Sequence, residues 1–229
     1  MGLYPLQGSK LAAVFFDITR AFESVSLDIL IAKLEAYGIR GTALEWFRTY
    51  LLNRSQTVIL RVGSQEYESE PITLNSGVPT GSILGPLLFL LYINDLPDLF
   101  LSDHSASTTM YADDVSISLT CSDLPSLQQG VDSSLHIMSE WCFQNEFVLN
   151  LKKSACMMFK QPRHFSSLSS SISAVTVFKL LGVHVDSNLK YTEHASHLCK
   201  SLLPLCYAFR RLRQTCSQQV LLTYLLRSC

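Results

Sequence analysis

The apolar residues of this chain fall into short continuous runs and into stripes at helical spacing. The run at residues 12–16 has the length of a strand and stops at Asp17, which predicts a strand buried on both faces and closed by a carboxylate. Two further β-favouring runs, 108–111 and 115–119, flank the segment 112–114. This pattern predicts a hairpin with an Asp-Asp pair at its tip.

Five other stretches repeat apolar residues at spacings of three and four, the period of a helix. The clearest of them begins after Asp123, a favourable N-cap residue. Another, at 83–94, is apolar on nearly every side, so we expect it to be buried. The predicted helices cover residues 27–37, 42–53, 83–94, 123–142 and 191 to the end of the chain.

Short β-favouring stretches, separated by glycine or by polar residues, account for most of the rest and predict three pairs. The first pair is joined across Gly63-Ser64 and the second, which is antiparallel, through a turn at 150–154; the third is a further strand or hairpin around Gly182. In this order, the pairs are 58–62 with 67–72, 147–149 with 155–159, and 175–181 with 183–185. Between the second and the third pair, the serine-rich stretch 166–173 predicts a mobile loop.

Asp113 and Asp114 are the first candidates for chemistry. Two adjacent carboxylates repel each other, so a tight turn that holds both is more stable with a cation nearby. Mg²⁺ suits this position, because it prefers carboxylate oxygen and leaves coordination positions for phosphate and water. A solvated turn would carry the same residues, since aspartate is common in turns, and both interpretations stay open at this point.

Two loops add further candidates. Residues 75–82 place glycines around Val78-Pro79-Thr80 and end in Ser82, an N-cap residue before a predicted helix whose free N–H groups favour phosphate. Ordinary loop punctuation by glycine is the alternative. Lys153, in the turn at 150–154, is either a functional cation or a solvated turn residue.

Charge is divided unevenly along the chain, although the net charge is only -1. Residues 62–151 contain 12 acidic and no basic side chains, whereas residues 152–229 contain 11 basic and 2 acidic ones. A basic region beside an acidic one fits a polyanion held on one side of the molecule and metal ions on the other. Two ordinary solvated faces are the alternative.

Other sequence features exclude several classes of protein. Seven scattered cysteines without a C-x-x-C pair indicate neither a zinc site nor a disulfide framework. His194 and His197 lack a third ligand nearby in the sequence, which favours surface histidines. The longest apolar run, 83–93, has 11 residues and is too short to cross a bilayer, and no secretory signal opens the chain. We therefore expect a soluble intracellular protein.

Five sequence strings follow one another along the chain: FFDITRAF at 15–22, SGVPTGSILGPLLFLLYINDL at 76–96, YADD at 111–114, LNLKK at 149–153 and KLLGVHVDSNL at 179–189. In the order and spacing of these strings the chain resembles the palm of reverse transcriptases from non-LTR (LINE-type) retrotransposons. The resemblance covers about residues 10–213 and implies an α+β fold. It implies a palm with an antiparallel sheet backed by helices at 1–189 and a partial helical thumb at 190–229.

The same resemblance implies an RNA-directed DNA polymerase that adds deoxynucleotides to a primer 3′-hydroxyl by two-metal phosphoryl transfer. Asp17 and Asp113 match the two carboxylates that hold two Mg²⁺ ions, for which Mn²⁺ is a possible substitute. Asp114 matches the second acid of the family's hairpin and supports metal binding. Lys153 matches a lysine proposed to protonate the departing pyrophosphate.

Substrate contacts are implied by the same motifs. Phe22 matches the bulky steric gate that selects deoxynucleotides, and Ile18 matches a backbone contact to the triphosphate. The implied partners are an RNA template, a DNA primer and deoxynucleoside triphosphates, with no membrane. The remaining implied residues are Thr80, Gly81 and Tyr111 for the substrate, and Leu181 and Gly182 for the primer grip.

The chain also departs from the family pattern. Thr80 replaces the usual glutamine and cannot make the same hydrogen bonds, and Glu23 replaces the usual aspartate. Only 16 residues precede Asp17, so we expect the fingers, the upstream endonuclease and most of the thumb to be absent or supplied by the remainder of a longer retroelement polyprotein.

These departures leave alternative functions open. The first alternative is a truncated, inactive fragment that only binds nucleic acid through its basic C-terminal region. The second is a metal-dependent phosphohydrolase that uses the same carboxylates. Family habit implies a nuclear location during reverse transcription and a cytoplasmic one otherwise.

Overall fold

The computed structural model describes residues 9–101, 105–160, 168–169 and 171–213. The chain divides into two compact units, Met1–Val175 and Thr176–Cys229. The predicted loop at 166–173 lies partly outside the described residues, as does the predicted helix beyond residue 213. The functional division into palm and thumb at residue 189 stays a prediction.

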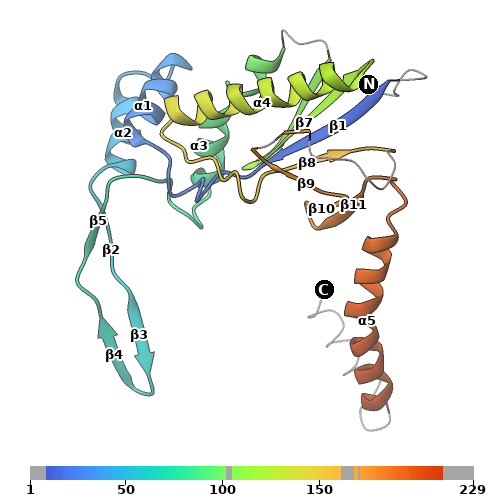
Figure 1. Cartoon of the computed structure of the whole chain (residues 1–229). Helices are drawn as coiled ribbons and strands as arrows, with labels where there is room; N and C mark the ends of the chain where they lie inside the picture. The colour runs from blue at the N-terminus through green and yellow to red at the C-terminus, as the bar shows by residue number, and fades with distance from the viewer. Residues whose placement is uncertain (1–8, 102–104, 161–167, 170, 214–229) are drawn as a thin grey trace. The chain divides into compact units, whose positions relative to one another are not determined.

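The first unit is built on a five-stranded sheet with the strand order β6-β7-β1-β8-β9 (Figure 1). Neighbouring strands are antiparallel except β8 and β9, which are parallel. The apolar run ending at Phe16 forms the central strand, and its residues from Ala12 onward are at most 5% exposed. The strands are β1 (Lys10–Phe16), β6 (Ala106–Tyr111), β7 (Asp114–Cys121), β8 (Ala155–Met158) and β9 (Ser173–Ala174).

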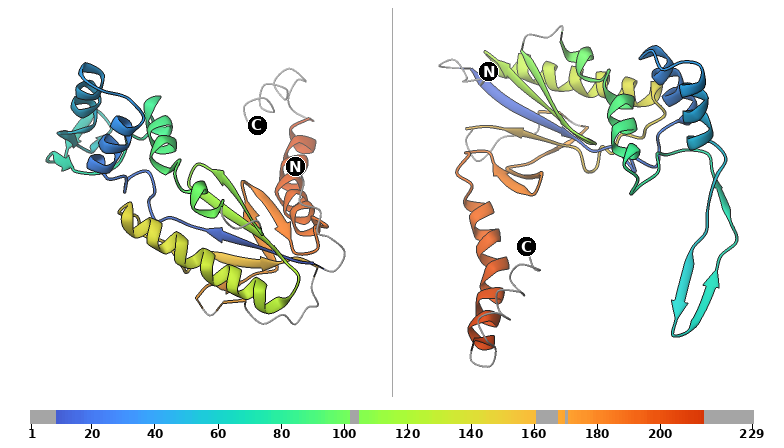
Figure 2. Two further views of the ribbon diagram at one scale, coloured as in Figure 1. Left: turned by 90° about the horizontal axis from the view of Figure 1, so that it is seen from above. Right: turned by 180° about the vertical axis from the view of Figure 1, so that it is seen from behind.

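Helices cover this sheet and extend beyond its end. The longest helix of the unit, α4, runs along one face of the sheet in both Figure 1 and Figure 2. Asp123 caps it by accepting the Ser126 N–H at 2.8 Å, as the N-cap pattern predicts. The helices are α1 (Leu27–Ala36), α2 (Thr42–Leu51), α3 (Leu84–Ile93), the short 3-10 turn η1 (Pro97–Phe100) and α4 (Leu124–Gln144).

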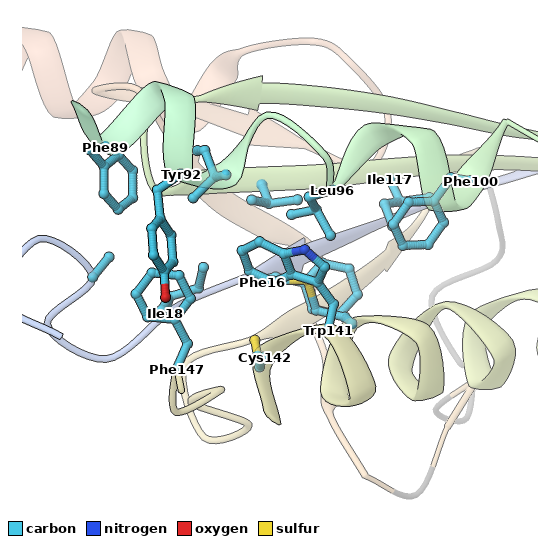
Figure 3. Close-up of a cluster of buried hydrophobic side chains, with 14 of the residues drawn as sticks. Phe16, Ile18, Phe89, Tyr92, Leu96, Phe100, Ile117, Trp141, Cys142 and Phe147 are labelled. Carbon is cyan, nitrogen blue, oxygen red and sulfur yellow. The ribbon is translucent and has the colours of Figure 1, made fainter. Parts of the chain in front are cut away.

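Aromatic side chains fill the core between α3, α4 and β1 (Figure 3). Phe147 lies between the rings of Tyr92 and Trp141, at centroid distances of 5.3 and 5.6 Å. The Tyr92 hydroxyl donates to the Asn145 carbonyl at 2.8 Å, and burial raises the pKa of Tyr92 to about 12. Only one face of α3 is buried, through Leu88, Phe89, Tyr92 and Ile93. The prediction that the whole helix is buried is wrong, because Leu87 and Leu90 on its other face are 53% and 49% exposed.

A two-stranded arm, residues 54–74, connects α2 to the loop before α3 (Figure 1). It contains two ladders, β2 (Arg54–Gln56) with β5 (Ile72–Leu74), and β3 (Ile59–Val62) with β4 (Gln65–Glu68). The predicted turn at Gly63-Ser64 is confirmed. The predicted strand 67–72 is wrong, because its residues are divided between β4 and β5.

The predicted pairing of 147–149 with 155–159 is also wrong. Leu149 forms an isolated antiparallel bridge with Ile18, and β8 pairs with β1. Both segments thus lie along the line of β1 instead of against each other. The buried edge of β1 offers more backbone and apolar contact than a solvent-exposed hairpin, which explains the preference.

The second unit contains a hairpin followed by a helix. Its elements are β10 (Val177–Leu180), β11 (Val183–Asp186) and α5 (Thr192–Leu212). His184 on β11 brings a third imidazole close to the predicted surface pair, with its ring 4.7 Å from His197 and 6.0 Å from His194. Across all described residues, no helix is long and apolar enough to span a membrane.

Candidate active site

The register of the sheet brings the predicted carboxylates to one end of it. Phe16 pairs with Val115 in the β1–β7 ladder, so Asp17 follows β1 where Asp114 begins β7. Asp113 occupies the turn between β6 and β7 beside Ala112, which adopts a left-handed φ of 51°. The pKa of Asp114 is raised by burial and by the nearby charges of Asp113 and Asp17. The predicted hairpin with acids at its tip is therefore confirmed.

The turn at 150–154 is attached to the end of β1, although the sequence pattern did not predict this contact. The Asp17 N–H donates to Ser154 Oγ at 3.1 Å, and the Asn150 N–H donates to the Asp17 carbonyl at 2.8 Å. These bonds bring Lys153 Nζ to 4.0 Å from Asp17 Oδ2. The side chain of Lys153 is 71% exposed and that of Asp17 is 39% exposed, so the pair is accessible to a ligand.

Phe22 is held by stacking and by its main chain. Its ring stacks on Phe89 of α3 with 4.2 Å between centroids and 18° between planes. The Val78 N–H donates to the Phe22 carbonyl at 3.0 Å. Because stacking restrains the ring and the hydrogen bond restrains its main chain, Phe22 presents a rigid surface to a ligand bound beside it.

The loop before α3 packs closely on the segment that contains Phe22. Gly77 has a φ of 83°, and a Cβ there would lie 2.8 Å from the Glu23 backbone, so only glycine fits. Helix α3 begins at Leu84, one residue later than predicted. Ser82 Oγ still accepts the Gly85 N–H at 2.9 Å and donates to the Pro79 carbonyl at 2.7 Å.

These elements enclose a pocket of about 550 Å³. Arg20 and Asn150 are among the lining residues that the motif analysis did not single out. Arg20 has a left-handed φ of 48°, which no feature of its sequence position signals. The predicted site residues that line the pocket are Asp17, Ile18, Phe22, Thr80, Asp113 and Lys153.

The other predicted site residues lie elsewhere. Tyr111 and Asp114 pair with each other on either side of the hairpin turn, outside the lining of the pocket, and Tyr111 is 67% exposed. Gly81 is exposed next to Thr80 and has a φ of 79°. Leu181 and Gly182 form the β10–β11 turn in the second unit, both with positive φ.

The pocket contains suitable ligands for a divalent cation. Asp17 and Asp113 both line it and offer hard carboxylate oxygens. Mg²⁺ commonly takes only one or two carboxylates and fills its other positions with water and substrate phosphate. Within the described residues, no group of three or more His, Cys, Asp or Glu side chains is arranged to hold a metal ion. The donor set therefore fits an ion shared with a phosphate ligand.

Comparison with known proteins identifies related sequences. The family described as reverse transcriptase (RNA-dependent DNA polymerase) matches residues 4–185. The chain is 28% identical over 201 residues to the probable RNA-directed DNA polymerase from transposon BS of Drosophila melanogaster, covering 80% of this chain and 21% of that protein. It is 24% identical over 193 residues to the RNA-directed DNA polymerase from mobile element jockey of the same species, covering 80% and 20%. The chain thus spans about a fifth of the length of these relatives.

A solved structure has a similar fold. Apo telomerase from Candida tropicalis, truncated from its C-terminal domain, superposes with a TM-score of 0.53 at 12% identity, covering 78% of this chain and 34% of that chain. At this identity the likeness concerns the fold alone, and it agrees with the predicted α+β class. The family match and these relatives together show that the chain belongs to the reverse transcriptase family and is related to the polymerases of non-LTR retrotransposons.

Proposed function

We propose that this chain carries the nucleotidyl-transfer centre of an RNA-directed DNA polymerase. One observation supports the proposal most directly: two carboxylates, a lysine and an aromatic ring from three separate segments of the chain line one pocket. Asp17, Asp113 and Lys153 are far apart in the sequence, and a purely structural role would not require them to meet. Their combination matches the needs of phosphoryl transfer, which depends on positioning and on neutralisation of charge.

In this proposal Asp17 and Asp113 would hold two Mg²⁺ ions, or Mn²⁺ in their place, and Asp114, next to the turn of the hairpin, would support them. When bound, these ions would supply neutralisation of the triphosphate charge and would lower the pKa of the primer 3′-hydroxyl. The hydroxyl gives its proton to water, its oxygen bonds to the α-phosphorus, the bond from that phosphorus to the bridging oxygen of the β-phosphate breaks, and pyrophosphate leaves. Lys153 Nζ donates a proton to that leaving group.

The remaining predicted residues shape the substrate site. The Phe22 ring excludes a ribose 2′-hydroxyl, and Thr80 and Gly81 face the nascent base pair. Ile18 contributes its backbone N–H to the triphosphate. The β10–β11 turn at Leu181 and Gly182 holds the primer, and the basic residues of α5, such as Arg210, bind the duplex backbone.

Primer extension tests the proposal. The full chain would be incubated with poly(rA)/oligo(dT), dTTP and Mg²⁺, and compared with Asp113→Asn and with Asp132→Asn, an exposed aspartate on α4 that serves as the matched control. We expect extension by the parent and the control and none by Asp113→Asn. Circular dichroism would establish that all three proteins are folded.

The opposite result has a defined meaning. Folded parent protein without extension would overturn the proposed activity and favour the inactive fragment that only binds nucleic acid. A filter-binding assay with the same template–primer would then measure what remains. Release of phosphate from dTTP without extension would favour the phosphohydrolase.

A further inference from the structure

Arg54 makes contacts that no motif of the sequence predicts. It is the first residue of β2 and is half-buried. Its Nε donates to the Leu51 carbonyl at 2.9 Å, and its Nη2 donates to the Gly77 carbonyl and, more weakly at 3.5 Å, to the Ser76 carbonyl. The guanidinium therefore ties the last residue of α2 to the start of the loop 76–82.

The opposite side of this loop is bound to the segment that contains Phe22. The Gly77 N–H donates to the Val25 carbonyl at 2.8 Å, and the Val78 N–H donates to the Phe22 carbonyl at 3.0 Å. Residues 76–78 are thus held between Arg54 and the backbone of residues 22–25. Because a Cβ at Gly77 would already be too close to Glu23, this segment has little room to shift.

Two properties of Arg54 favour a positioning role over a simple helix cap. A helix cap needs only the contact to Leu51, whereas the second contact reaches a loop more than twenty residues away. Arg54 also forms no ion pair within the described part of the chain, so its charge is directed at carbonyl groups. A planar guanidinium can serve acceptors in two directions at once, which a lysine ammonium on a flexible stem does less well.

We propose that Arg54 is a positioning residue for the nucleotide pocket, an inference that rests on the proposed function. It fixes the carbonyl of Gly77, and the adjacent Val78 N–H fixes the carbonyl of Phe22. The rigid unit formed in this way sets the distance between the Phe22 ring and Thr80, which line the same pocket. Arg54 thereby controls nucleotide affinity and the choice between deoxyribose and ribose.

The test combines kinetics with hydrogen exchange on the full chain. Arg54→Gln and Arg54→Lys would be compared with Arg48→Gln, an exposed arginine on α2 whose partner is Glu45. We expect Arg54→Gln to raise KM for dTTP about tenfold, the loss expected for one charged hydrogen bond, with kcat changed much less. Discrimination against UTP should fall, and Arg54→Lys should lie between parent and Arg54→Gln.

Hydrogen exchange followed by mass spectrometry gives a readout that does not need activity. The Gly77 and Val78 amides should exchange faster in Arg54→Gln than in the parent, while the amides of β1 and β7 should not change. Unchanged exchange at residues 76–82 would overturn the inference, as would faster exchange everywhere, since that indicates only lost stability. If Arg54→Gln does not fold, Arg54→Lys decides by the same criteria.

The two proposals can fail separately. A parent chain without polymerase activity, combined with faster exchange at Gly77 and Val78 in the variant, would overturn the proposed function and retain the positioning contact. An active parent whose KM, UTP discrimination and loop exchange are unaffected by Arg54→Gln would overturn the inference alone.

Discussion

Strand β7 and the arm segment 58–62 both place large apolar residues at every second position but differ completely in burial. In β7 the three apolar side chains are at most 2% exposed, whereas those of the arm are 59–63% exposed. The alternation is therefore sufficient to make a strand but does not decide whether its apolar face is covered. The two sets are Val115, Ile117 and Leu119 in β7, and Val58, Leu60 and Val62 in the arm.

The two faces of the arm nevertheless differ in composition. Leu60 lies opposite Tyr67, so Val58, Leu60 and Val62 share one face with this aromatic ring. The other face carries Ile59, and on it Arg61 pairs with Glu66 at 2.8 Å. In β7 the apolar face packs under α4, which the arm lacks. A two-stranded hairpin without a covering element is marginally stable in water. Cover by a helix, and not the local pattern of apolar residues, therefore distinguishes β7 in the five-stranded sheet from the arm.

Matched alanine substitutions test this comparison most strongly. Ile117→Ala removes a fully buried side chain from the sheet and should lower the free energy of unfolding by about 3–4 kcal/mol. Leu60→Ala in the arm should change it by less than about 0.5 kcal/mol. Urea denaturation followed by circular dichroism measures both. Similar losses for the two variants would mean that the arm is packed as tightly as the sheet.

Two glycines with positive φ extend the comparison to the backbone. Gly77→Ala adds a Cβ at 2.8 Å from the Glu23 backbone and should lower the free energy of unfolding by about 2–3 kcal/mol. Gly63→Ala, in the open turn of the arm, has no atom within 4 Å and should cost only the strain of its φ, about 1 kcal/mol. Urea midpoints rank the two, and a larger loss for Gly63→Ala would contradict the crowded contact at Gly77.

Local patterns were sufficient to predict the elements that depend on local physics. The spacing of apolar residues, together with caps such as Asp123, located the helices to within a few residues. The uninterrupted run before Asp17 located the central strand. The Asp-Asp pair between two β-favouring runs located the hairpin, and this placed Asp113 in the lining of the pocket.

Contacts between distant polar segments could not be predicted in this way. The bond from Asp17 to Ser154 joins residues that share no periodicity and exists only because β1 and β8 are neighbours. The same holds for Arg54 and Gly77, which are joined by the arm. Such contacts depend on chain topology, which no single stretch of residues encodes.

The end of the sheet is intermediate in burial between the core of β7 and the arm. Substitution of Asp114 at this end tests the effect of charge on stability there. The pKa of Asp114 is raised in the folded state, so folding disfavours the ionised carboxylate. The resulting loss of stability is complete at pH values above the pKa of Asp114 in the folded state. It vanishes at pH values below the pKa of Asp114 in the unfolded state. Asp114→Asn should therefore raise the free energy of unfolding at pH 7 in metal-free buffer. Since the side chain is exposed, solvent screening limits the gain to about 0.5 kcal/mol.

Urea titrations at pH 7 and pH 3 measure the effect of Asp114→Asn, with Asp132→Asn as the control on an exposed surface of α4. We expect the difference from the parent to disappear at pH 3, where both states bind the proton. An equal gain at both pH values would show that the substitution acts through packing and not through charge.

The smallest change in stability is expected on the apolar face of the arm. Replacing Val58, Leu60 and Val62 together by threonine puts β-branched side chains suited to a strand at all three positions, so the free energy of unfolding should change by less than about 0.5 kcal/mol. The triple variant should bind less of the dye ANS and self-associate less in sedimentation velocity, because an exposed apolar patch promotes both. Ile59→Thr, on the opposite face of the hairpin, is the control. A loss above about 1 kcal/mol would mean that the apolar face is covered in the free chain, and the contrast with β7 would then no longer hold.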